Sequence, residues 1–187
     1  MTRSVEQAFS YFLSSANAGY IPAWTNLGNC YVEGRGTKCD FEKAAVAYKW
    51  AVELSRDRIA MFNLGLLVTS GKIKDNDVSL KHGYNLIREA AKLGHPIAAF
   101  NMGVASFDGN DFVRQDYKEA ISWYQMAAYG GFSQALANLG LMYYSGTGVQ
   151  KDLKKAKLIF SKGASLGEKV CIGLLPQVER ELNELQK

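Results

Sequence analysis

The feature that most constrains the fold of this chain is a short sequence that returns at a nearly constant interval. The triplet Asn-Leu-Gly or Asn-Met-Gly occurs four times, and successive copies lie 37, 38 and 37 residues apart. An alanine stands three residues before each copy. A repeat of this length is typical of helical arrays, in which a single unit cannot bury its apolar face and has to stack on its neighbours. The triplets begin at Asn26, Asn63, Asn101 and Asn138.

A second pattern lies between the triplets and predicts that each unit consists of two helices. Three intervening segments start at Asp40, Asp116 and Asp152, whose carboxylates can accept hydrogen bonds from the free amides of a helix N-terminus. The triplet glycine falls inside the first helix, where it costs about 1 kcal/mol relative to alanine. We therefore expect another helix to press against it. The second helices are expected to end at glycines, namely Gly19, Gly94, Gly131 and Gly167.

The most complete copy, residues 135–160, resembles the Sel-one-like repeat of the tetratricopeptide-like superfamily. It reads A-x-x-N-L-G-x-x-Y-x-x-G-x-G-V-x-x-D-x-x-K-A-x-x-x-F. The resemblance covers roughly residues 4–167, and the second copy departs from it most. It implies an all-α, right-handed α-solenoid of helix-turn-helix repeats. It also implies an adaptor or scaffold for protein–protein interaction that has no shared catalytic residue.

We expect one repeat domain over residues 1–187. It would contain an N-terminal half repeat, four full repeats and a C-terminal capping helix that covers the last repeat. Within the tail, Pro176 is tolerated best in the first turn of a helix, so the capping helix is expected to start there. The expected boundaries are 1–19, 20–56, 57–94, 95–131, 132–167 and 168–187.

Composition places the chain among soluble globular proteins. Hydrophobic residues make up 48% of it and charged residues 21%, and no apolar run is long enough to span a bilayer. We expect a cytoplasmic protein without membrane insertion. A net charge of +4 is too small to indicate a nucleic-acid partner. The densest basic run, residues 151–157, is interpreted as a solvated face, with an acidic partner or a nucleic-acid surface as the alternative. The three cysteines are expected to be reduced thiols, although a Cys30–Cys39 disulfide stays open.

The chemistry of known catalytic and metal sites is not expected here. His82 and His95 are too far apart for a helical metal pair, and His95 precedes a proline, where a structural role is favoured. The sequence DGND at 108–111 lacks the later ligands of a calcium loop, and KDND at 74–77 is interpreted as a polar turn. We therefore expect no catalytic residue, cofactor or metal.

The first helix of each repeat has an inward face and an opposite face, and the opposite face is apolar in three of the four repeats. One interpretation is a groove that binds a peptide or amphipathic helix. The alternative is that these side chains pack internally. The repeated asparagines lie at the border of the two faces, where each amide could bond to the adjacent repeat or hold the backbone of a bound chain. The candidate binding residues are Asn29, Phe62, Asn63, Leu66, Phe100, Asn101, Val104, Phe107, Asn138, Leu141 and Tyr144.

The sequence thus predicts a non-enzymatic protein that binds a protein or peptide in a concave groove lined by the first helices. One alternative is a structural subunit that forms homo-oligomers through an unpaired N-terminal helix containing residues 6–16. Another is a regulator or immunity-type protein that neutralises an effector.

Overall fold

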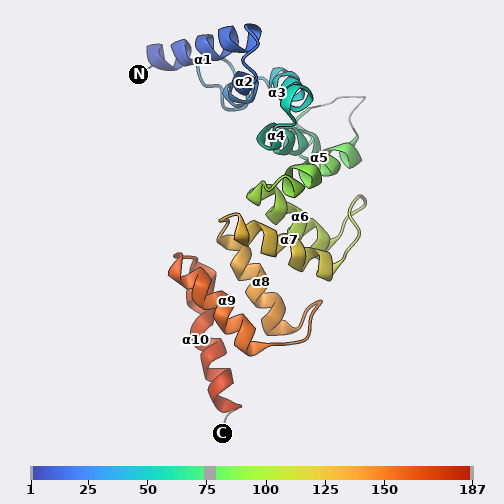
Figure 1. Ribbon diagram of the computed structural model, residues 1–187, viewed down its shortest axis with the longest axis vertical. Helices are drawn as coiled ribbons and strands as arrows, with labels where there is room; N and C mark the ends of the chain where they lie inside the picture. The colour runs from blue at the N-terminus through green and yellow to red at the C-terminus, as the bar shows by residue number, and fades with distance from the viewer. Residues whose placement is uncertain (1, 74–78, 186–187) are drawn as a thin grey trace. The chain divides into compact units, whose positions relative to one another are not determined.

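The computed structural model describes residues 2–73 and 79–185, and every regular element in that part of the chain is an α-helix (Figure 1). The expected all-α repeat fold is therefore confirmed. The first helices of the four repeats are α2, α4, α6 and α8, and the second helices are α3, α5, α7 and α9. The bounds are α1 (Thr2–Asn17), α2 (Pro22–Glu33), α3 (Phe41–Ser55), α4 (Arg58–Thr69), α5 (Leu80–Lys92), α6 (Pro96–Asp108), α7 (Tyr117–Tyr129), α8 (Gln134–Ser145), α9 (Leu153–Ser165) and α10 (Lys169–Glu184).

The contacts between residues divide the chain into two compact units, Met1–Leu93 and Gly94–Lys187. The first unit contains α1 to α5 and the second contains α6 to α10. In each unit every helix packs on the next one along the chain, and in the second unit α10 also contacts α8. The segment KDND at 74–77 lies outside the described residues.

The helix starts agree with the sequence pattern. Asp40, Asp116 and Asp152 each cap a second helix, and their carboxylates accept hydrogen bonds from backbone amides two or three residues later. His95 caps α6 in the same way, because its Nδ1 accepts a hydrogen bond from the amide of Ala98 at 3.1 Å. The predicted structural role of His95 is therefore confirmed. Four of the turns use glycines with positive φ, at Gly19, Gly94, Gly131 and Gly167.

The triplet glycines lie where the two helices of a repeat touch. A Cβ atom at Gly140 would stand 2.4 Å from the ring of Phe160, a distance that real Cβ atoms essentially never show. The Phe160 ring is fully buried and has little room to move. The same contact recurs in the other repeats, so the expectation that a second helix presses on each glycine is confirmed. We call these contacts the glycine seam: Gly28–Tyr48, Gly65–Ile87, Gly103–Tyr124 and Gly140–Phe160.

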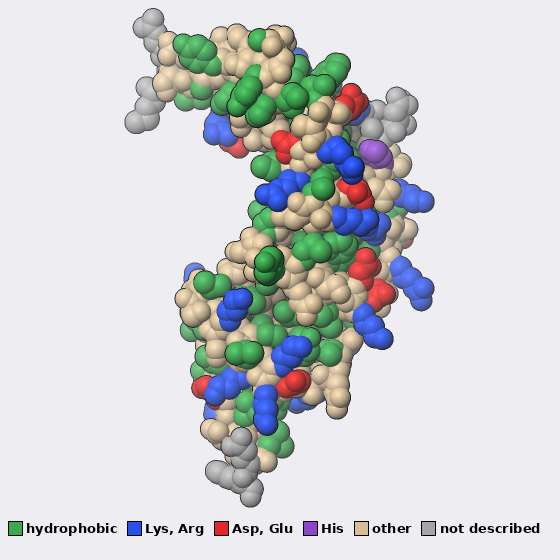
Figure 2. Space-filling model, viewed as in Figure 1, with side chains coloured by type: hydrophobic (Ala, Val, Ile, Leu, Met, Phe, Trp, Pro, Cys, Tyr) green, Lys and Arg blue, Asp and Glu red, His purple; other side chains and the backbone are tan. Residues whose placement is uncertain are grey.

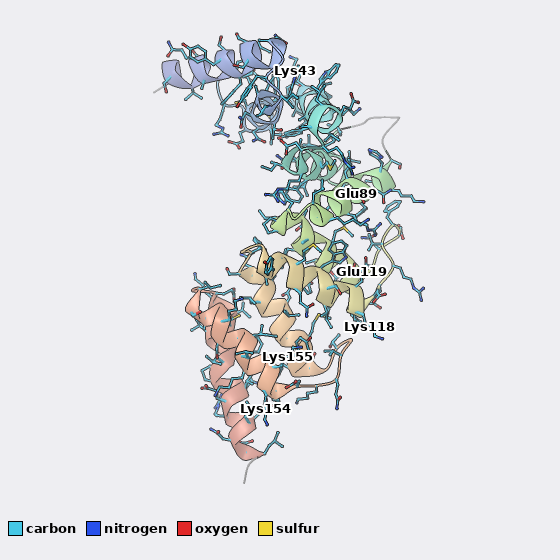
Figure 3. The ribbon with its side chains drawn as sticks, viewed as in Figure 1. Lys43, Glu89, Lys118, Glu119, Lys154 and Lys155 are labelled. Atoms are coloured by element: carbon cyan, nitrogen blue, oxygen red, sulfur yellow. The ribbon has the colours of Figure 1, made fainter. Side chains whose placement is uncertain are left out.

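At its inward face, the third repeat has a hydrogen bond where the fourth repeat has a contact between a lysine and an aromatic ring. In the fourth repeat, the Lys155 ammonium lies 4.2 Å from the centre of the Tyr143 ring. The equivalent residues of the third repeat are Ser106 and Glu119, and the buried Ser106 hydroxyl donates a hydrogen bond to Glu119 Oε2 at 3.3 Å. Figure 3 labels Glu119 on α7 and Lys155 on α9. The third repeat thus differs from the fourth at both positions of this pair, and the buried Ser106 hydroxyl has a hydrogen-bond partner.

The tail corrects the sequence prediction. A capping helix is present, but it begins at Lys169 and continues through Pro176, which lies inside it. A proline in a helix interior removes one backbone hydrogen bond. The helix is nevertheless anchored on both sides of the proline, because Cys171 before it and Val178 after it are both buried. Packing of both halves therefore outweighs the local preference for a break.

In the described part of the chain, no helix is long and apolar enough to cross a membrane.

Candidate functional site

A hollow of about 370 Å³ opens in the first unit, where two successive first helices and the second helix between them meet. Asn29 and Val32 come from α2, Tyr48 from α3, and Asn63 and Leu66 from α4. We call it pocket A. The structure thus brings together three of the candidate residues, Asn29, Asn63 and Leu66. Its complete lining is Asn29, Val32, Glu33, Tyr48, Asn63, Leu66, Leu67, Ser70 and Lys72.

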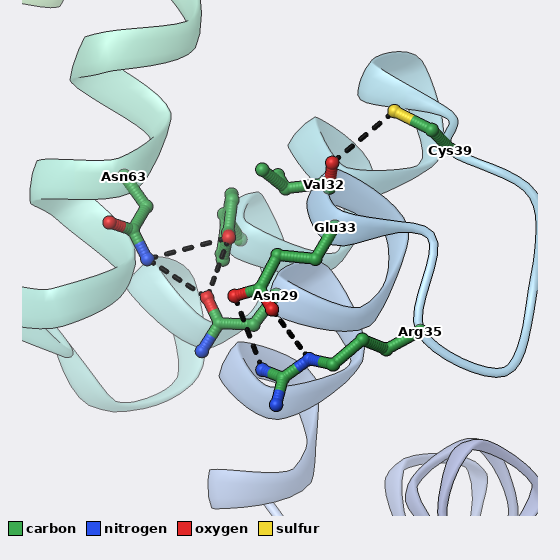
Figure 4. Close-up of polar contacts among 7 residues, drawn as sticks. Asn29, Val32, Glu33, Arg35, Cys39 and Asn63 are labelled. Atoms are coloured by element: carbon green, nitrogen blue, oxygen red, sulfur yellow. Dashed lines mark hydrogen bonds and ion pairs between the residues drawn. The ribbon is translucent and has the colours of Figure 1, made fainter. Parts of the chain in front are cut away.

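The polar groups of pocket A are occupied by one another (Figure 4). The Tyr48 hydroxyl donates to Asn29 Oδ1 at 2.7 Å, and Asn63 Nδ2 donates to the same oxygen at 3.0 Å. Burial raises the pKa of the Tyr48 hydroxyl well above its ordinary value, so the hydroxyl remains a donor. At the rim, Glu33 pairs with Arg35 at 2.6 Å. The amide of Asn63 therefore bonds to the preceding repeat, as one interpretation of the asparagines predicted.

Asn26 behaves differently from Asn63. Its side chain is exposed, and Nδ2 donates to the Pro22 carbonyl of its own helix at 3.4 Å. The helix that precedes this repeat is α1, which packs on α2 through an apolar cluster around Ala16. Among the described residues, Asn26 therefore bonds within its own helix and not to the first helix of a preceding repeat. This contact is of the same kind as those of α3 with α4 and of α7 with α8, in which a second helix packs on the first helix of the next repeat.

A second hollow, of about 340 Å³, opens in the second unit between α6, α7 and α8. We call it pocket B. It brings together four of the candidate residues: Val104, Phe107, Asn138 and Leu141. Its complete lining is Val104, Phe107, Asp108, Tyr124, Asn138, Leu141, Met142, Ser145 and Thr147.

Tyr124 forms the floor of pocket B. Burial raises the pKa of its hydroxyl, a hydrogen bond with Asn138 opposes the rise, and the negative charge of Asp108 adds to it. Asp108 is exposed, and its carboxylate has no hydrogen bond or ion pair within residues 2–73 and 79–185. Pocket B thus carries an uncompensated negative charge at its edge.

The two pockets consist of equivalent positions. Every residue that lines pocket A has a counterpart in pocket B, 75 residues later in eight cases and 76 residues later for Tyr48 and Tyr124. Four positions carry the same residue in both pockets: Tyr48 and Tyr124, Asn63 and Asn138, Leu66 and Leu141, and Ser70 and Ser145. The recurrence shows that the site is a property of the repeat and not an accident of one surface.

Phe62 corrects the sequence analysis, which placed it on the exposed binding face. Its side chain is buried, with 7% of its surface exposed. The residues that precede the triplet asparagine in the first and fourth repeats, Thr25 and Ala137, are buried too. Thr25 shows the reason, because its hydroxyl donates to Asp57 of the next repeat at 2.7 Å. This position therefore faces the neighbouring repeat in the stack.

Three further candidates lie outside both pockets. Phe100 is half-buried, with its ring 5.8 Å from that of Tyr124 and 4.9 Å from that of Phe132. Asn101 is half-buried on α6. Tyr144 bonds to the capping helix through its hydroxyl, which contacts Glu181 and accepts a hydrogen bond from Gln177 at 2.8 Å. The ring contacts of Phe100 and the bonds of Tyr144 are thus made within the chain.

The sequence analysis missed the second-helix tyrosines that form the floors of the pockets. Tyr48 and Tyr124 stand at matching places in the second helices, each four residues after an alanine (Ala44 and Ala120) that itself lies four residues after the capping aspartate. This regular spacing was visible in the sequence. It pointed to the core, and the structure shows that each ring fills the glycine seam while its hydroxyl reaches the pocket.

The basic run of α9 is partly neutralised by the capping helix. Lys151 lies 3.7 Å from Glu181, and Lys157 lies 3.0 Å from Glu179. Lys154 and Lys155 project from the first turn of α9 (Figure 3). On the face shown in Figure 2, basic and acidic side chains stand near one another over this part of the chain. The lysines therefore do not form a surface of one sign.

The cysteines are free thiols in the structure. Cys30 and Cys171 are buried, and burial raises the pKa of each, to about 12 for Cys171. The exposed Cys39 donates a hydrogen bond to the carbonyl of Val32 at 3.3 Å (Figure 4). The described residues contain no cluster of side chains that could hold a metal ion.

The repeats of this chain match those of a known protein family. The Sel1 repeat model matches residues 1–20, 23–51, 58–95, 96–132 and 133–168. The chain therefore belongs to the Sel1 repeat family, as the sequence resemblance indicated. Proteins of this family are generally non-catalytic scaffolds, and their repeats typically bind other proteins.

Solved structures and curated relatives agree with this assignment. A Sel1 repeat protein from Oxalobacter formigenes is 31% identical, with a TM-score of 0.82 over 92% of this chain and 67% of that one. The protective antigen c5321 of uropathogenic Escherichia coli is 32% identical, with a TM-score of 0.81 over 91% of this chain and 36% of that one. Among curated proteins, the chain is similar to rat (Rattus norvegicus) DAP3-binding cell death enhancer 1, with 30% identity over 164 residues. That match covers 86% of this chain and 31% of the rat protein, so the chain spans under a third of the curated relatives it matches.

Proposed function

We propose that this chain is a non-enzymatic interaction module that binds a protein or peptide through pockets A and B. The observation that carries the proposal is the recurrence of one pocket, with an apolar wall and an amide, at equivalent positions of both units. A pocket of this kind suits a peptide, because apolar side chains supply the binding energy and an amide can bond to a peptide backbone. The name of the rat relative, DAP3-binding cell death enhancer 1, is consistent with a protein partner.

We also propose that the partner is not a nucleic acid. The lysines of α9 are paired in part with glutamates of α10, and the charged residues that line pocket B are confined to Asp108. A nucleic-acid surface requires a concentrated positive charge that can replace the counterions of phosphates.

The test uses one exposed leucine from each pocket. Leu66 and Leu141 are 36% and 37% exposed, so aspartate at either position should reach solvent without unfolding the repeat. We expect Leu66→Asp combined with Leu141→Asp to remove the proteins that the wild-type chain captures from a cell lysate. The matched control is Leu158→Asp on α9, which is 71% exposed and lies outside both pockets.

Circular dichroism should show equal helix content in all of these variants. If the double variant captures the same proteins as the wild type, the pockets are not the binding sites. If Leu158→Asp abolishes capture as well, the loss reflects added charge and not the pockets.

A further inference from the structure

Pockets A and B have the same shape but differ in how many of their polar groups are already occupied. In pocket A, the Asn63 amide bonds to both Asn29 and Tyr48, and the Glu33 carboxylate bonds to Arg35. The one cation of its lining, Lys72, lies over the ring of Phe41, 4.6 Å from its centre. Nothing charged is left without a partner in pocket A.

Pocket B replaces the residue that occupies the amide in pocket A. Val104 stands at the position of Asn29, so the amide of Asn138 lacks the side-chain partner that Asn63 has there, and the Tyr124 hydroxyl is its polar neighbour in the pocket. An amide has two N–H donors and one acceptor oxygen. One bond to a hydroxyl therefore leaves a donor and the carbonyl oxygen for a ligand. Asn138 is half-buried, so a bonded ligand is shielded from competing water.

The walls of pocket B are more apolar than those of pocket A. Phe107 stands where pocket A has Val32, and Met142 stands where it has Leu67. Together with Val104 and the partly exposed Leu141, these residues form an apolar socket. Phe107 contributes a large, flat apolar surface against which a bound side chain can pack.

The charge at the edge of pocket B is negative. Asp108 has no partner in the described part of the chain, and Thr147 replaces the lysine that pocket A carries at that position. A negative charge beside an apolar socket favours a ligand with a positive charge next to its apolar group. An acidic ligand would be repelled.

We infer that pocket B is the primary binding site and that it takes a peptide segment in which an apolar side chain lies next to lysine or arginine. The apolar side chain fills the socket, the peptide backbone bonds to Asn138, and the basic side chain pairs with Asp108. Pocket A, whose polar groups bond to one another, is the weaker site. The inference rests on the proposed function, because it names the ligand of one of the two pockets.

The chain itself supplies the controls. Val104→Asn gives pocket B the residue of pocket A and should occupy the Asn138 amide, and Asn29→Val makes the reverse change. Each substitution places a residue that the equivalent position already accommodates, so both variants should fold. Asp108→Asn removes the charge while preserving the shape of the side chain.

The experiment selects binders from a phage-displayed library of random peptides on the wild-type chain and measures their affinities by fluorescence anisotropy. We expect the selected peptides to contain an apolar residue beside lysine or arginine. Val104→Asn should weaken binding by about tenfold, which corresponds to about 1.4 kcal/mol. Asp108→Asn should weaken it a few-fold and reduce its dependence on salt. Asn29→Val frees the Asn63 amide in pocket A and should not weaken binding. Leu158→Asp, which lies outside both pockets, should leave the affinity unchanged.

Other results overturn the inference in distinguishable ways. If Asn29→Val weakens binding and Val104→Asn does not, or if the selected peptides are acidic, pocket B is not the primary site, but the proposed function stands. If no peptide binds above background, or if binding survives the combined Leu66→Asp and Leu141→Asp change, the proposed function fails together with the inference.

Discussion

The glycine seam inside each repeat and the pockets between successive repeats recur with the same period, but they vary to different degrees. The seam pairs a glycine with a bulky side chain in all four repeats, and the bulky partner is Tyr, Ile, Tyr and Phe in turn. The pocket walls change in charge and polarity, as Asn29 against Val104 and Lys72 against Thr147 show. Close packing in the seam sets the distance between the helices, and this leaves the walls free to differ without altering the fold. Apart from Tyr48 and Tyr124, which belong to both regions, the closely packed seam and the variable pocket walls thus consist of separate residues.

The largest expected effect comes from filling the seam. Gly140→Ala places a Cβ 2.4 Å from the buried Phe160 ring, so one of the helices has to move. We expect a loss of about 1–3 kcal/mol in the free energy of unfolding, as for other overpacked cores. The control is Gly173→Ala in α10, where a Cβ meets nothing within 4 Å. That change should stabilise the protein by up to about 1 kcal/mol through helix propensity alone.

Urea denaturation monitored by circular dichroism measures both variants. If Gly140→Ala and the wild type have the same free energy of unfolding, the helices of the glycine seam can move apart at little cost. The distinction between a rigid seam and variable walls would then fail.

An intermediate effect is expected at Tyr48, which belongs to both regions. Tyr48→Phe keeps the ring in the seam and removes the hydroxyl that bonds to Asn29 and Asn63. We expect a loss of about 1 kcal/mol, because two half-buried amides lose a partner. The equivalent change in pocket B, Tyr124→Phe, removes a hydroxyl that has Val104 and not an asparagine opposite it, so among the described residues Asn138 is the amide affected, and the change should cost less. Thermal unfolding of the two variants side by side checks the order, and a larger loss for Tyr124→Phe would contradict the described difference between the pockets.

The smallest effect appears in alkaline solution. Cys171 is buried against Gly163, and its pKa rises from 9.0 to about 12 on folding, mainly because burial disfavours the thiolate. The folded chain therefore holds this proton more tightly than the unfolded chain. The resulting contribution to stability is complete below pH 9 and is lost progressively as the pH rises toward 12. We expect the free energy of unfolding of Cys171→Ala to fall less steeply than that of the wild type over this range. Parallel curves would show that Cys171 does not titrate on unfolding.

Periodicity in the sequence was sufficient to predict the repeats, the capping aspartates and the glycine seam. These features depend on local rules, since a cap serves its own helix and a seam joins two helices close in the chain. The helical period likewise placed Asn63 at the border between the two faces of its helix. The helical wheel places residues around one helix, however, and does not tell which part of the opposite face meets the next repeat. Phe62 was misplaced for that reason.

The tail and the floors of the pockets also depend on tertiary packing, which local sequence patterns do not predict. Pro176 predicts a helix break by local preference, and only the tertiary burial of Cys171 and Val178 on either side of it explains why the helix continues. Tyr48 and Tyr124 were recognisable as core residues from their spacing. That their hydroxyls reach a pocket depends on how successive repeats stack, which a wheel drawn for a single helix does not contain.

Each pocket requires three consecutive helices, because its walls come from the first helices of two successive repeats and its floor from the second helix between them. Repeat arrays open locally, one unit at a time, at a free energy below that of global unfolding. Detachment of a single neighbouring helix therefore abolishes a pocket while most of the helices remain intact. The apparent affinity for a ligand is reduced by the fraction of molecules in which that helix is detached. If the pockets bind as proposed, a substitution far from either pocket can change affinity by shifting the population of stacked repeats alone.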